Sequence, residues 1–468
     1  MTENMREMKK ILTIISVLAV TAVSCTDYLD IKPYGKTIPK TADEFASLLH
    51  YHLNEIDWGE EVIVGNINSV MDLECYADNL ESILTQYPQG NFLPLYIGDH
   101  LSSKQDLYED LYEIIRDCNL VLGYLEERDT RLGQDVLGTA YALRGVCYYV
   151  LLKNFCEPYE GDAAGKLGVP LVTEFDMEAK PLRSTFAQTV GRADEDLRTA
   201  ISYDIQDPVY RFNSDVAKGY LARLHFWAGN YEKAAGYASE LLQKYPLIGG
   251  EAYKAMMESE IEKTGNMIFK SYVIAESSHQ LSYSGYKSTI LSRPISRRFI
   301  DLFAGEETSD IRYSISVGAD RVNNKCAFAC LRSAELQLIM MESYYHMGRE
   351  TDALSALNEL RRFRVTGVTD YTMETLPPVN ADDIIKQDAE GNALTPLIYA
   401  ILCERRKELY MEGDRWYELK RNGRPEMWTA KNSRKFTTYS YMYTFPISIR
   451  DLELVDGLVQ NPGYEVVE

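Results

Sequence analysis

Cysteine and histidine are scarce in this chain of 468 residues, which contains eight of the former and six of the latter. Seven cysteines follow Cys25, and an odd, scattered set does not make a disulfide framework. Cys326 and Cys330 could share a helix face as half of a metal site, but no histidine or second cysteine pair lies near them in the sequence. His50 and His52 stand in a stretch with helical periodicity, where a spacing of two points them apart. We therefore expect buried thiols, no metal site and no cofactor.

Positive charge is also in short supply. The chain has 49 Lys and Arg residues against 70 Asp and Glu, a net charge of -21. Such a chain repels, on average, the phosphate backbone of nucleic acids and anionic lipid surfaces. Nucleic-acid binding is therefore not expected.

Motifs of common enzyme classes are missing. The chain contains no HExxH zinc motif and no GxSxG nucleophile turn. The tripeptide Gly35-Lys36-Thr37 resembles the end of a phosphate-binding loop, but Asp30 occupies a position at which that loop needs glycine. We expect a protein that is not an enzyme.

Tyrosine, in contrast, is abundant, with 34 residues against 14 Phe and 4 Trp. A tyrosine ring combines a flat apolar face with a polar tip. This composition suits the binding of amphipathic ligands such as sugars.

Residues 1–24 have the pattern of a lipoprotein signal peptide. Three basic residues, the last of them Lys10, precede the apolar stretch Ile11–Ser24, which is too short to span a bilayer and ends just before Cys25. In bacterial lipoproteins this cysteine becomes the acylated N-terminus. A plain cleaved signal and a buried first helix are the alternative interpretations. We expect lipidation at Cys25, whose acyl chains would give lasting attachment to a membrane.

Helical periodicity dominates 41–244, 331–364 and 395–421. The stretch Ser214–Pro246 has alanines where two helices must approach closely, a Gly229-Asn230 turn and a terminal proline, and so resembles a tetratricopeptide repeat. The stretch Leu336–Phe363 keeps the same offset between turn glycine and packing alanine, and weaker helix pairs are expected at 107–127 and 139–155. We expect an all-α fold of about four such pairs in a curved scaffold.

Long insertions interrupt the repeats at Asp57–Leu101, Cys156–Arg183 and Gly249–Cys330. They are richer in Gly, Pro, Tyr and Asn, and are expected to be loops with minor β structure. Long loops on a rigid scaffold are where binding function tends to lie.

The segment ERRKELYMEGDRWYELKRNG, from Glu404 to Gly423, is dense in charge. On a helix that begins near Leu397 it has a packing face. Gly413 interrupts the run, so the helix is expected to bend or restart there. The residues of the packing face are Leu402, Leu409, Trp416 and Leu419.

The carboxylates of this segment do not suit catalysis. Glu404 and Lys407 are three residues apart, as are Arg405 and Glu408, so each pair can form an ion pair along the helix. Basic neighbours favour the ionised form of both glutamates, whereas a glycosidase needs one carboxyl with a raised pKa. We interpret the role of the segment as structural rather than catalytic.

The same segment resembles the late-chain signature of the SusD-like (RagB/SusD) nutrient-binding outer-membrane lipoproteins of Bacteroidetes, ERR-x-EL-x-x-EG-x-R-x-x-x-LKR, every letter of which is present. Cys25–Pro33 is similar to the start of that family, and RSAELQLIMMESYYHMG is similar to its second-half repeat. Thr444–Tyr464 is similar to its ending, although Ser448 replaces a usual proline. The resemblance covers essentially the whole chain.

The resemblance implies a signal peptide at 1–24 and one domain at 25–468, with a helical half at about 25–248 and a loop-rich half at about 249–468. It implies a lipid-anchored protein on the exterior of the outer membrane that binds a glycan or other nutrient oligomer. The expected partner is a SusC-like TonB-dependent β-barrel transporter. A tetratricopeptide-type scaffold without a ligand site is the alternative. Starch, host glycan, plant polysaccharide and peptide all stay open as ligands.

Sugar rings stack on aromatic faces while their hydroxyls bond to polar side chains. Family members place ligand aromatics in comparable insertions, whereas Trp227 and Trp416 lie in expected helices and should be core. The ligand-binding candidates are Trp58, Tyr76, Asp78, Asn79, Tyr87, Asn91 and Tyr96 in the first insertion and Tyr283, Tyr286 and Tyr313 in the third.

Overall fold

The structure is a computed structural model that describes residues 39–58, 61–81, 96–259, 263–271, 293–431 and 434–464. The chain divides into two units, Met1–Lys40 and Thr41–Glu468. Only Pro39 and Lys40 of the first unit are described, and all the elements named below belong to the second.

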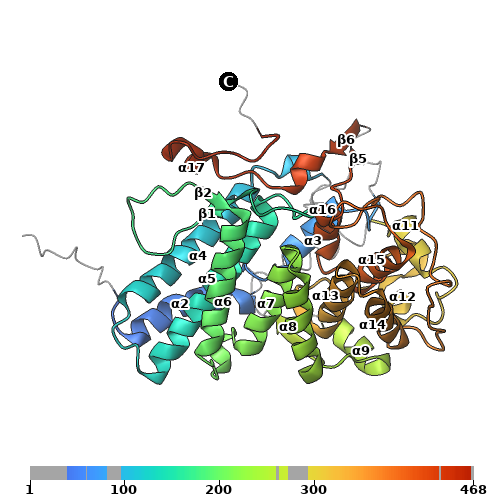
Figure 1. The fold of residues 1–468 in the computed structure, drawn as a ribbon, viewed down its shortest axis with the longest axis horizontal. Coiled ribbons are helices and arrows are strands. Elements are labelled where there is room, and N and C mark those ends of the chain that lie inside the picture. The colour runs from blue at the N-terminus through green and yellow to red at the C-terminus, as the bar shows by residue number, and fades with distance from the viewer. Residues whose placement is uncertain are drawn as a thin grey trace, which may run out of the picture. The chain divides into compact units, whose positions relative to one another are not determined.

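The N-terminal half of the second unit is helical (Figure 1). Its helices follow one another with short connections, except around two insertions. They are α2 (Ala42–Trp58), α3 (Ile67–Tyr76), α4 (Lys104–Tyr124), α5 (Arg131–Phe155), α6 (Phe186–Ser202), α7 (Ser214–Trp227) and α8 (Tyr231–Lys244).

The described residues form three small antiparallel sheets of two strands each, one in the second insertion of the N-terminal half and two among the helices of the C-terminal half. The strand pairs are β1 (Leu167–Pro170) with β2 (Arg183–Thr185), β3 (Met267–Lys270) with β4 (Cys330–Arg332), and β5 (Met427–Lys431) with β6 (Arg434–Thr438). The remaining helices are α9 (Gly250–Glu258), α11 (Arg297–Ile300), α12 (Ile311–Ser316), α13 (Ser333–His346), α14 (Glu350–Arg362), α15 (Pro396–Glu408), α16 (Asp414–Arg421) and α17 (Ile449–Leu454).

The helical pairs predicted from the repeats are confirmed. Helices α7 and α8 meet at Gly229, and α13 and α14 meet at Gly348, with φ angles of 73° and 70° that favour glycine. The small residues Ala222, Ala234 and Ala238 are fully buried, which lets the paired helices approach closely. Successive helices from α4 to α8 pack on one another, and α13 packs on α8, α14 and α15 (Figure 1).

The first insertion is more ordered than we expected, because it contains α3. Asn66 accepts a hydrogen bond from the backbone N–H of Ser69 and so caps the start of this helix. Helix α3 packs against α16 of the signature segment. The expectation of a loop there was wrong, and the Asn66 cap is the local signal that identifies the helix.

The signature segment is confirmed as two helices that restart at Gly413, whose φ is 73°. The predicted pair of Glu404 with Lys407 forms at 2.5 Å. The predicted pair of Arg405 with Glu408 was wrong, because Arg405 binds Asp414 with Nη2–Oδ1 and Nε–Oδ2 distances of 2.5 and 2.8 Å.

Glu408 instead receives arginines from distant parts of the chain. Arg332 lies 2.7 Å from its carboxylate, Arg364 lies at 2.8 and 2.9 Å, and Arg312 at 3.3 Å. All four side chains are buried. Burial alone would raise the pKa of Glu408, but the surrounding guanidinium groups, those of Arg364 and Arg332 first, hold it well below the usual range. The signature segment therefore contains a buried ionic junction that joins α15 to α12, to β4 and to the residues just after α14.

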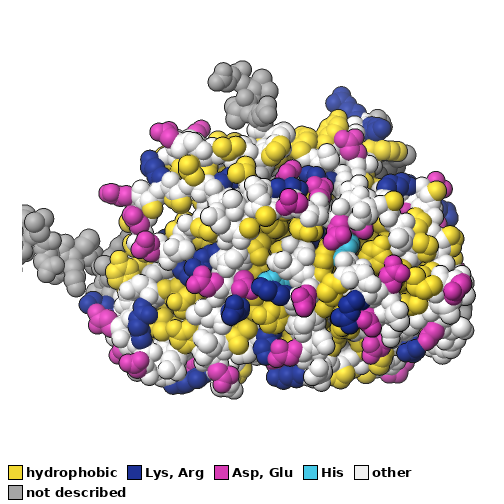
Figure 2. Space-filling view, in the orientation of Figure 1, with side chains coloured by type: hydrophobic (Ala, Val, Ile, Leu, Met, Phe, Trp, Pro, Cys, Tyr) yellow, Lys and Arg dark blue, Asp and Glu magenta, His cyan; other side chains and the backbone are white. Residues whose placement is uncertain are grey.

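Trp227 and Trp416 are buried, as predicted for core residues. On the face drawn in Figure 2, acidic and basic side chains are interspersed with apolar ones. None of the described helices combines the length and the apolar character needed to cross a bilayer.

Candidate functional site

A cavity of about 930 Å³ opens beside the β5–β6 hairpin. Its walls come from four segments that are far apart in the sequence: 75–81 at the end of α3, 293–298 at the start of α11, the loop 381–386, and 425–430 together with Thr438. We call it the hairpin pocket. Its volume lies within the range of known small-ligand sites.

Backbone pairing brings the first and third insertions together at this pocket. Leu80 and Ile295 form an antiparallel bridge. The N–H of Glu81 donates to the carbonyl oxygen of Pro294 at 2.8 Å, and that of Ser296 donates to the carbonyl oxygen of Asn79 at 2.8 Å. The two insertions that were expected to carry the ligand site are thus adjacent.

Two arginines of the signature segment hold one wall of the pocket. Arg415 lies 2.7 Å from Oδ1 of Asp78, and Arg406 lies 3.1 Å from Oδ2 of the same carboxylate. Arg406 also donates to Oδ1 of Asn79 at 2.8 Å. Burial would raise the pKa of Asp78, but Arg406 and Arg415 hold it well below its usual range. Asp78 is therefore an ionised hydrogen-bond acceptor that the two arginines hold in place. The signature segment thereby fixes this wall of the pocket.

Trp428 presents an aromatic face at the pocket. It lies on β5, paired in register with Thr437, and 62% of the residue's surface is exposed. The ammonium group of Lys435 lies 5.4 Å from the centre of its ring. Tyr96 supports the hairpin, because its hydroxyl donates to the carbonyl oxygen of Thr437 at 2.8 Å and its ring packs on Phe436. An exposed tryptophan on a braced hairpin can stack on a planar or ring-shaped ligand.

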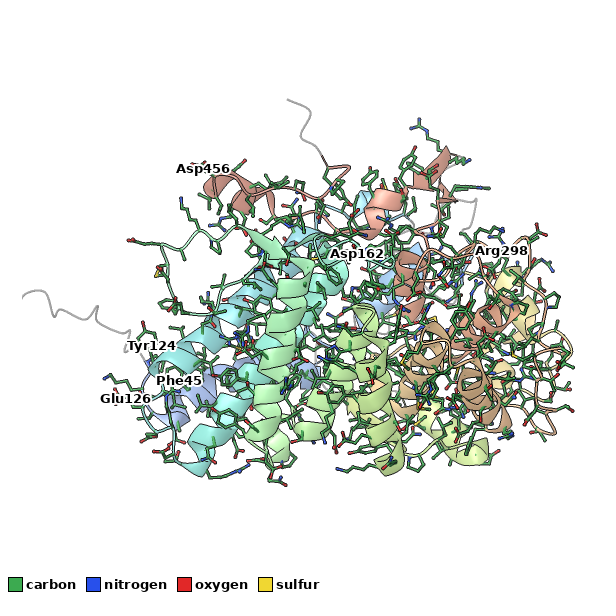
Figure 3. All side chains as sticks on the ribbon, viewed as in Figure 1. Phe45, Tyr124, Glu126, Asp162, Arg298 and Asp456 are labelled. Carbon is green, nitrogen blue, oxygen red and sulfur yellow. The ribbon has the colours of Figure 1, made fainter. Side chains whose placement is uncertain are left out.

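Charged side chains of both signs line the same pocket as Trp428. Arg297 and Arg298 are exposed on α11, and Arg298 is labelled on the right of the view in Figure 3. Asp382 and Lys386 are exposed on the facing loop. The pocket therefore offers both donors and acceptors to a ligand with many hydroxyl groups.

The structure places the ligand-binding candidates that were predicted from the sequence in different parts of the molecule. Tyr76 and Asp78 line the hairpin pocket. Asn79 lies beneath it, fully buried, with its amide bonded to Glu74 and Arg406. Tyr96 lies behind the hairpin. Cys25, Tyr87, Asn91, Tyr283 and Tyr286 lie outside the described residues.

Two other candidates do not line the pocket. Trp58 is the last residue of α2 and is 44% exposed. Tyr313, on α12, packs its ring 5.4 Å from that of Phe303. Glu81 and Arg293, which do line the pocket, directly adjoin the segments 82–95 and 272–292 that carry four of the predicted residues.

Sequence reasoning missed Trp428. It follows the signature in Met-Trp-Thr-Ala-Lys, a short stretch in which the side chains alternate between the two faces of a strand. That alternation is the available signal, but it does not show that the outward face borders a cavity.

Family comparisons match most of the chain. A family described as SusD-like_3, "Starch-binding associating with outer membrane", matches residues 27–226, and the SusD family, SusD_RagB, matches residues 313–464. The chain belongs to the SusD-like family. The resemblance inferred from the signature is thereby confirmed. No curated protein matches the chain.

Solved structures of SusD-like proteins share the fold. A SusD superfamily protein from Bacteroides thetaiotaomicron is 20% identical, with a TM-score of 0.67 over 90% of this chain and 100% of that one. A SusD-like carbohydrate binding protein from Bacteroides vulgatus is 19% identical, with a TM-score of 0.65 over 90% of this chain and 98% of that one. At such identities the likeness establishes the helical SusD-like fold.

Proposed function

We propose that this SusD-like protein is a non-catalytic binding protein that holds a glycan in the hairpin pocket. The observation that carries the proposal is the exposed face of Trp428 on the wall of a cavity of about 930 Å³. Asp78, Arg297 and Arg298 supply polar groups on the lining of the same cavity. The neighbour from Bacteroides vulgatus that is described as a carbohydrate binding protein supports this choice of ligand class.

Capture without chemistry is supported by the ionised state of Glu404 and Glu408 in the signature segment. Burial would raise the pKa of Glu404, but Arg312 and Lys407 hold it well below the usual range, as the arginines do for Glu408. Both carboxylates are thereby kept ionised, which is the opposite of what a glycosidase acid needs. Asp78 is fixed in the same way at the pocket itself.

The setting we propose is the outer surface of the outer membrane, with an anchor of acyl chains on Cys25 and delivery to a SusC-like TonB-dependent transporter. The family description as associating with the outer membrane supports this setting. A protein-interaction scaffold is the second candidate. Exposed apolar residues of the C-terminal segment favour a protein contact there, namely Ile449, Leu454 and Val459, together with the exposed Leu182, which lies beside Gly457.

Two exposed tryptophans provide a matched test of the glycan site. In calorimetric titration against a glycan panel, Trp428→Ala is expected to lose about ten-fold or more in affinity, or about 1.4 kcal/mol, because the stacking face is removed. Trp58→Ala is the control, since Trp58 is exposed but does not line the pocket. Equal affinities for the two variants would contradict the assigned site.

The partner is tested separately. Affinity purification from outer membranes should recover a TonB-dependent barrel with wild type and with Trp428→Ala alike. A protein that recovers the barrel yet binds no glycan of the panel would favour the scaffold function.

A further inference from the structure

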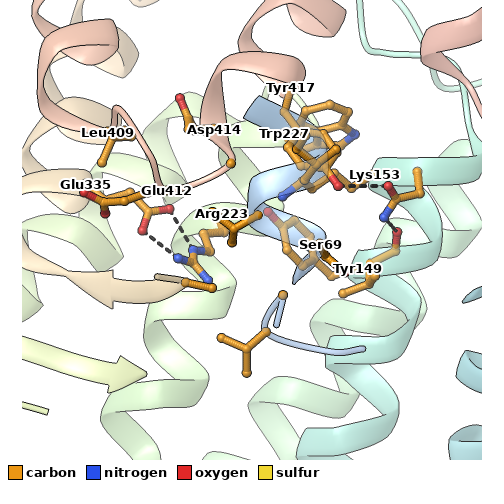
Figure 4. Close-up of a pocket in the computed structure, with 18 of the residues that line it drawn as sticks. Ser69, Tyr149, Lys153, Arg223, Trp227, Glu335, Leu409, Glu412, Asp414 and Tyr417 are labelled. Atoms are coloured by element: carbon orange, nitrogen blue, oxygen red, sulfur yellow. Dashed lines mark hydrogen bonds and ion pairs between the residues drawn. The ribbon is translucent and has the colours of Figure 1, made fainter. Parts of the chain in front are cut away.

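A second cavity lies between the helical pairs and the signature segment (Figure 4). Helices α5 and α7 contribute Tyr149, Lys153 and Arg223 to its lining, and the signature contributes residues from Arg405 to Arg421. Its volume is about 140 Å³, whereas a single water needs roughly 10–15 Å³. It shares no lining residue with the hairpin pocket. We call it the central cavity.

The charged side chains around the central cavity are paired, with one exception. A buried charge is stable only when an opposite charge or several hydrogen bonds compensate it. The compensated pairs are Arg223 with Glu335 at 2.6 Å, Arg405 with Asp414 at 2.5 Å, Glu412 with Lys325 and Arg332 at 2.8 Å each, Glu418 with Arg415 at 2.8 Å, and Arg421 with Glu342 at 2.9 Å.

Lys153 is the exception. Among the described residues, no carboxylate oxygen lies within 4 Å of its ammonium nitrogen. The nitrogen instead lies 3.5 Å from the ring centre of Tyr417 and 5.8 Å from that of Tyr149. Aromatic faces attract a cation but do not neutralise it. Lys153 is half-buried, and it is the one lysine on the wall of the central cavity that no carboxylate among the described residues pairs with.

The charges around Lys153 also favour a negative partner for its ammonium group. Burial lowers the pKa of Lys153 to about 7, and the neighbouring Arg223 and Arg405 lower it as well, whereas Asp414 and Glu335 act in the opposite direction. A negative charge placed in the cavity would relieve both the burial and the repulsion from the two guanidinium groups.

Hydrogen-bond donors on the lining also lack partners. Trp227 Nε1, Arg405 Nη1 and Arg421 Nη2 are buried and have no hydrogen-bond partner among the described residues. These atoms can only donate. Glu418 Oε1 is an unpaired acceptor on the same lining. The Tyr220 hydroxyl, which can donate or accept, also lacks a partner on this lining, so donor-only atoms outnumber acceptor-only ones, which favours an occupant rich in lone pairs.

We propose that the central cavity binds a small monovalent anion, either a halide or a carboxylate group, beside the Lys153 ammonium. One negative charge matches the one cation of the lining that no described carboxylate pairs with, while a doubly charged oxyanion would leave a charge in excess. The bound anion would lie between α5, which carries Lys153, and the signature segment, which carries Tyr417. It would therefore stabilise the junction between the helical repeats and the signature.

Bromide is the direct probe, because its anomalous scattering identifies it in a crystal. Crystals of the full chain soaked in bromide should give an anomalous peak within about 3.5 Å of Lys153 Nζ. Acetate added to the same soak distinguishes the two sources: loss of the peak assigns the site to both halides and carboxylates, and its persistence assigns it to halides. Absence of a peak at Lys153 in wild-type crystals overturns the proposal.

Thermal unfolding at constant ionic strength tests the site in solution. Replacing a bulky sulfonate by bromide should raise the Tm of wild type by about 1–2 °C for each ten-fold increase above the dissociation constant. The rise should vanish in Lys153→Met. It should persist in Lys244→Met, because Lys244 also lies over a tyrosine ring but is exposed and paired with Asp215. The same rise in Lys153→Met as in wild type overturns the proposal.

Discussion

Two buried glutamates of the signature segment should respond in opposite directions to the same substitution. Glu408 accepts hydrogen bonds from Arg332 and Arg364 at 2.7–2.9 Å. Glu418 accepts one from Arg415 at 2.8 Å, while its Oε1 has no partner among the described residues. Both side chains are buried, and glutamine has nearly the size of either.

The magnitudes follow from these surroundings. Removing one member of a buried ion pair costs about 3–5 kcal/mol, so Glu408→Gln should lose about that much stability at pH 7. Burial raises the pKa of Glu418 from 4.5 to about 7, so its ionisation costs the folded state roughly 3 kcal/mol above pH 7. Glu418→Gln imitates the neutral carboxyl and should gain up to about 3 kcal/mol at pH 8.

The two effects also differ in their pH dependence. Glu408 has a lowered pKa in the folded state, so its stabilisation is present above about pH 4.5 and declines as the pH falls further. Glu418 has a raised pKa, so its penalty is absent below about pH 4.5, grows up to pH 7 and is then constant. The gain from Glu418→Gln should therefore disappear near pH 4.

Urea unfolding followed by far-ultraviolet circular dichroism at pH 4 to 8 measures both differences in the free energy of unfolding. Wild type and the two variants serve as mutual controls, because the chemical change is identical. An equal loss of stability for both variants at pH 8 would refute the reasoning, since burial rather than the number of arginine partners would then decide the outcome.

Further predictions concern the backbone and the thiols. Gly413→Ala should lose about 1–2 kcal/mol in urea unfolding because its φ is 73°, whereas Gly191→Ala, at an exposed position of α6 where a Cβ meets nothing within 4 Å, should gain about 0.5–1 kcal/mol. A gain at Gly413 would contradict the restart of the helix there. The thiols of Cys75, Cys118, Cys147, Cys156, Cys330 and Cys403 are not in disulfides and are buried or half-buried, so Ellman's reagent should react slowly with them in the folded protein and fully in urea without reductant. A need for reductant would contradict unpaired thiols.

The helical repeats could be predicted because their signals are local. The turn at Gly229 and the small residue Ala234 lie five positions apart, and each reports directly on how two successive helices meet. The restart of the helix at Gly413 could be predicted for the same reason. A helical period or a glycine turn needs no knowledge of the rest of the chain.

The ionic junction and the hairpin pocket could not be predicted in this way. The partners of Glu408 are 44 to 96 residues away, and only the folded chain brings them to the same carboxylate. The pocket likewise needs Asp78, Arg298 and Trp428 from three distant segments. The local sequence pattern indicated the insertions that carry Asp78 and Arg298, but it did not indicate that the β5–β6 hairpin contributes to the site.

The most direct test of the central claim is a crystal structure of the protein with an oligosaccharide that binds in the glycan panel. We predict an intact sugar chain in the hairpin pocket, with one ring stacked on Trp428 and hydroxyl groups near Asp78. A sugar bound at another surface, or a chain found cleaved, would contradict the claim that this pocket holds a nutrient without altering it.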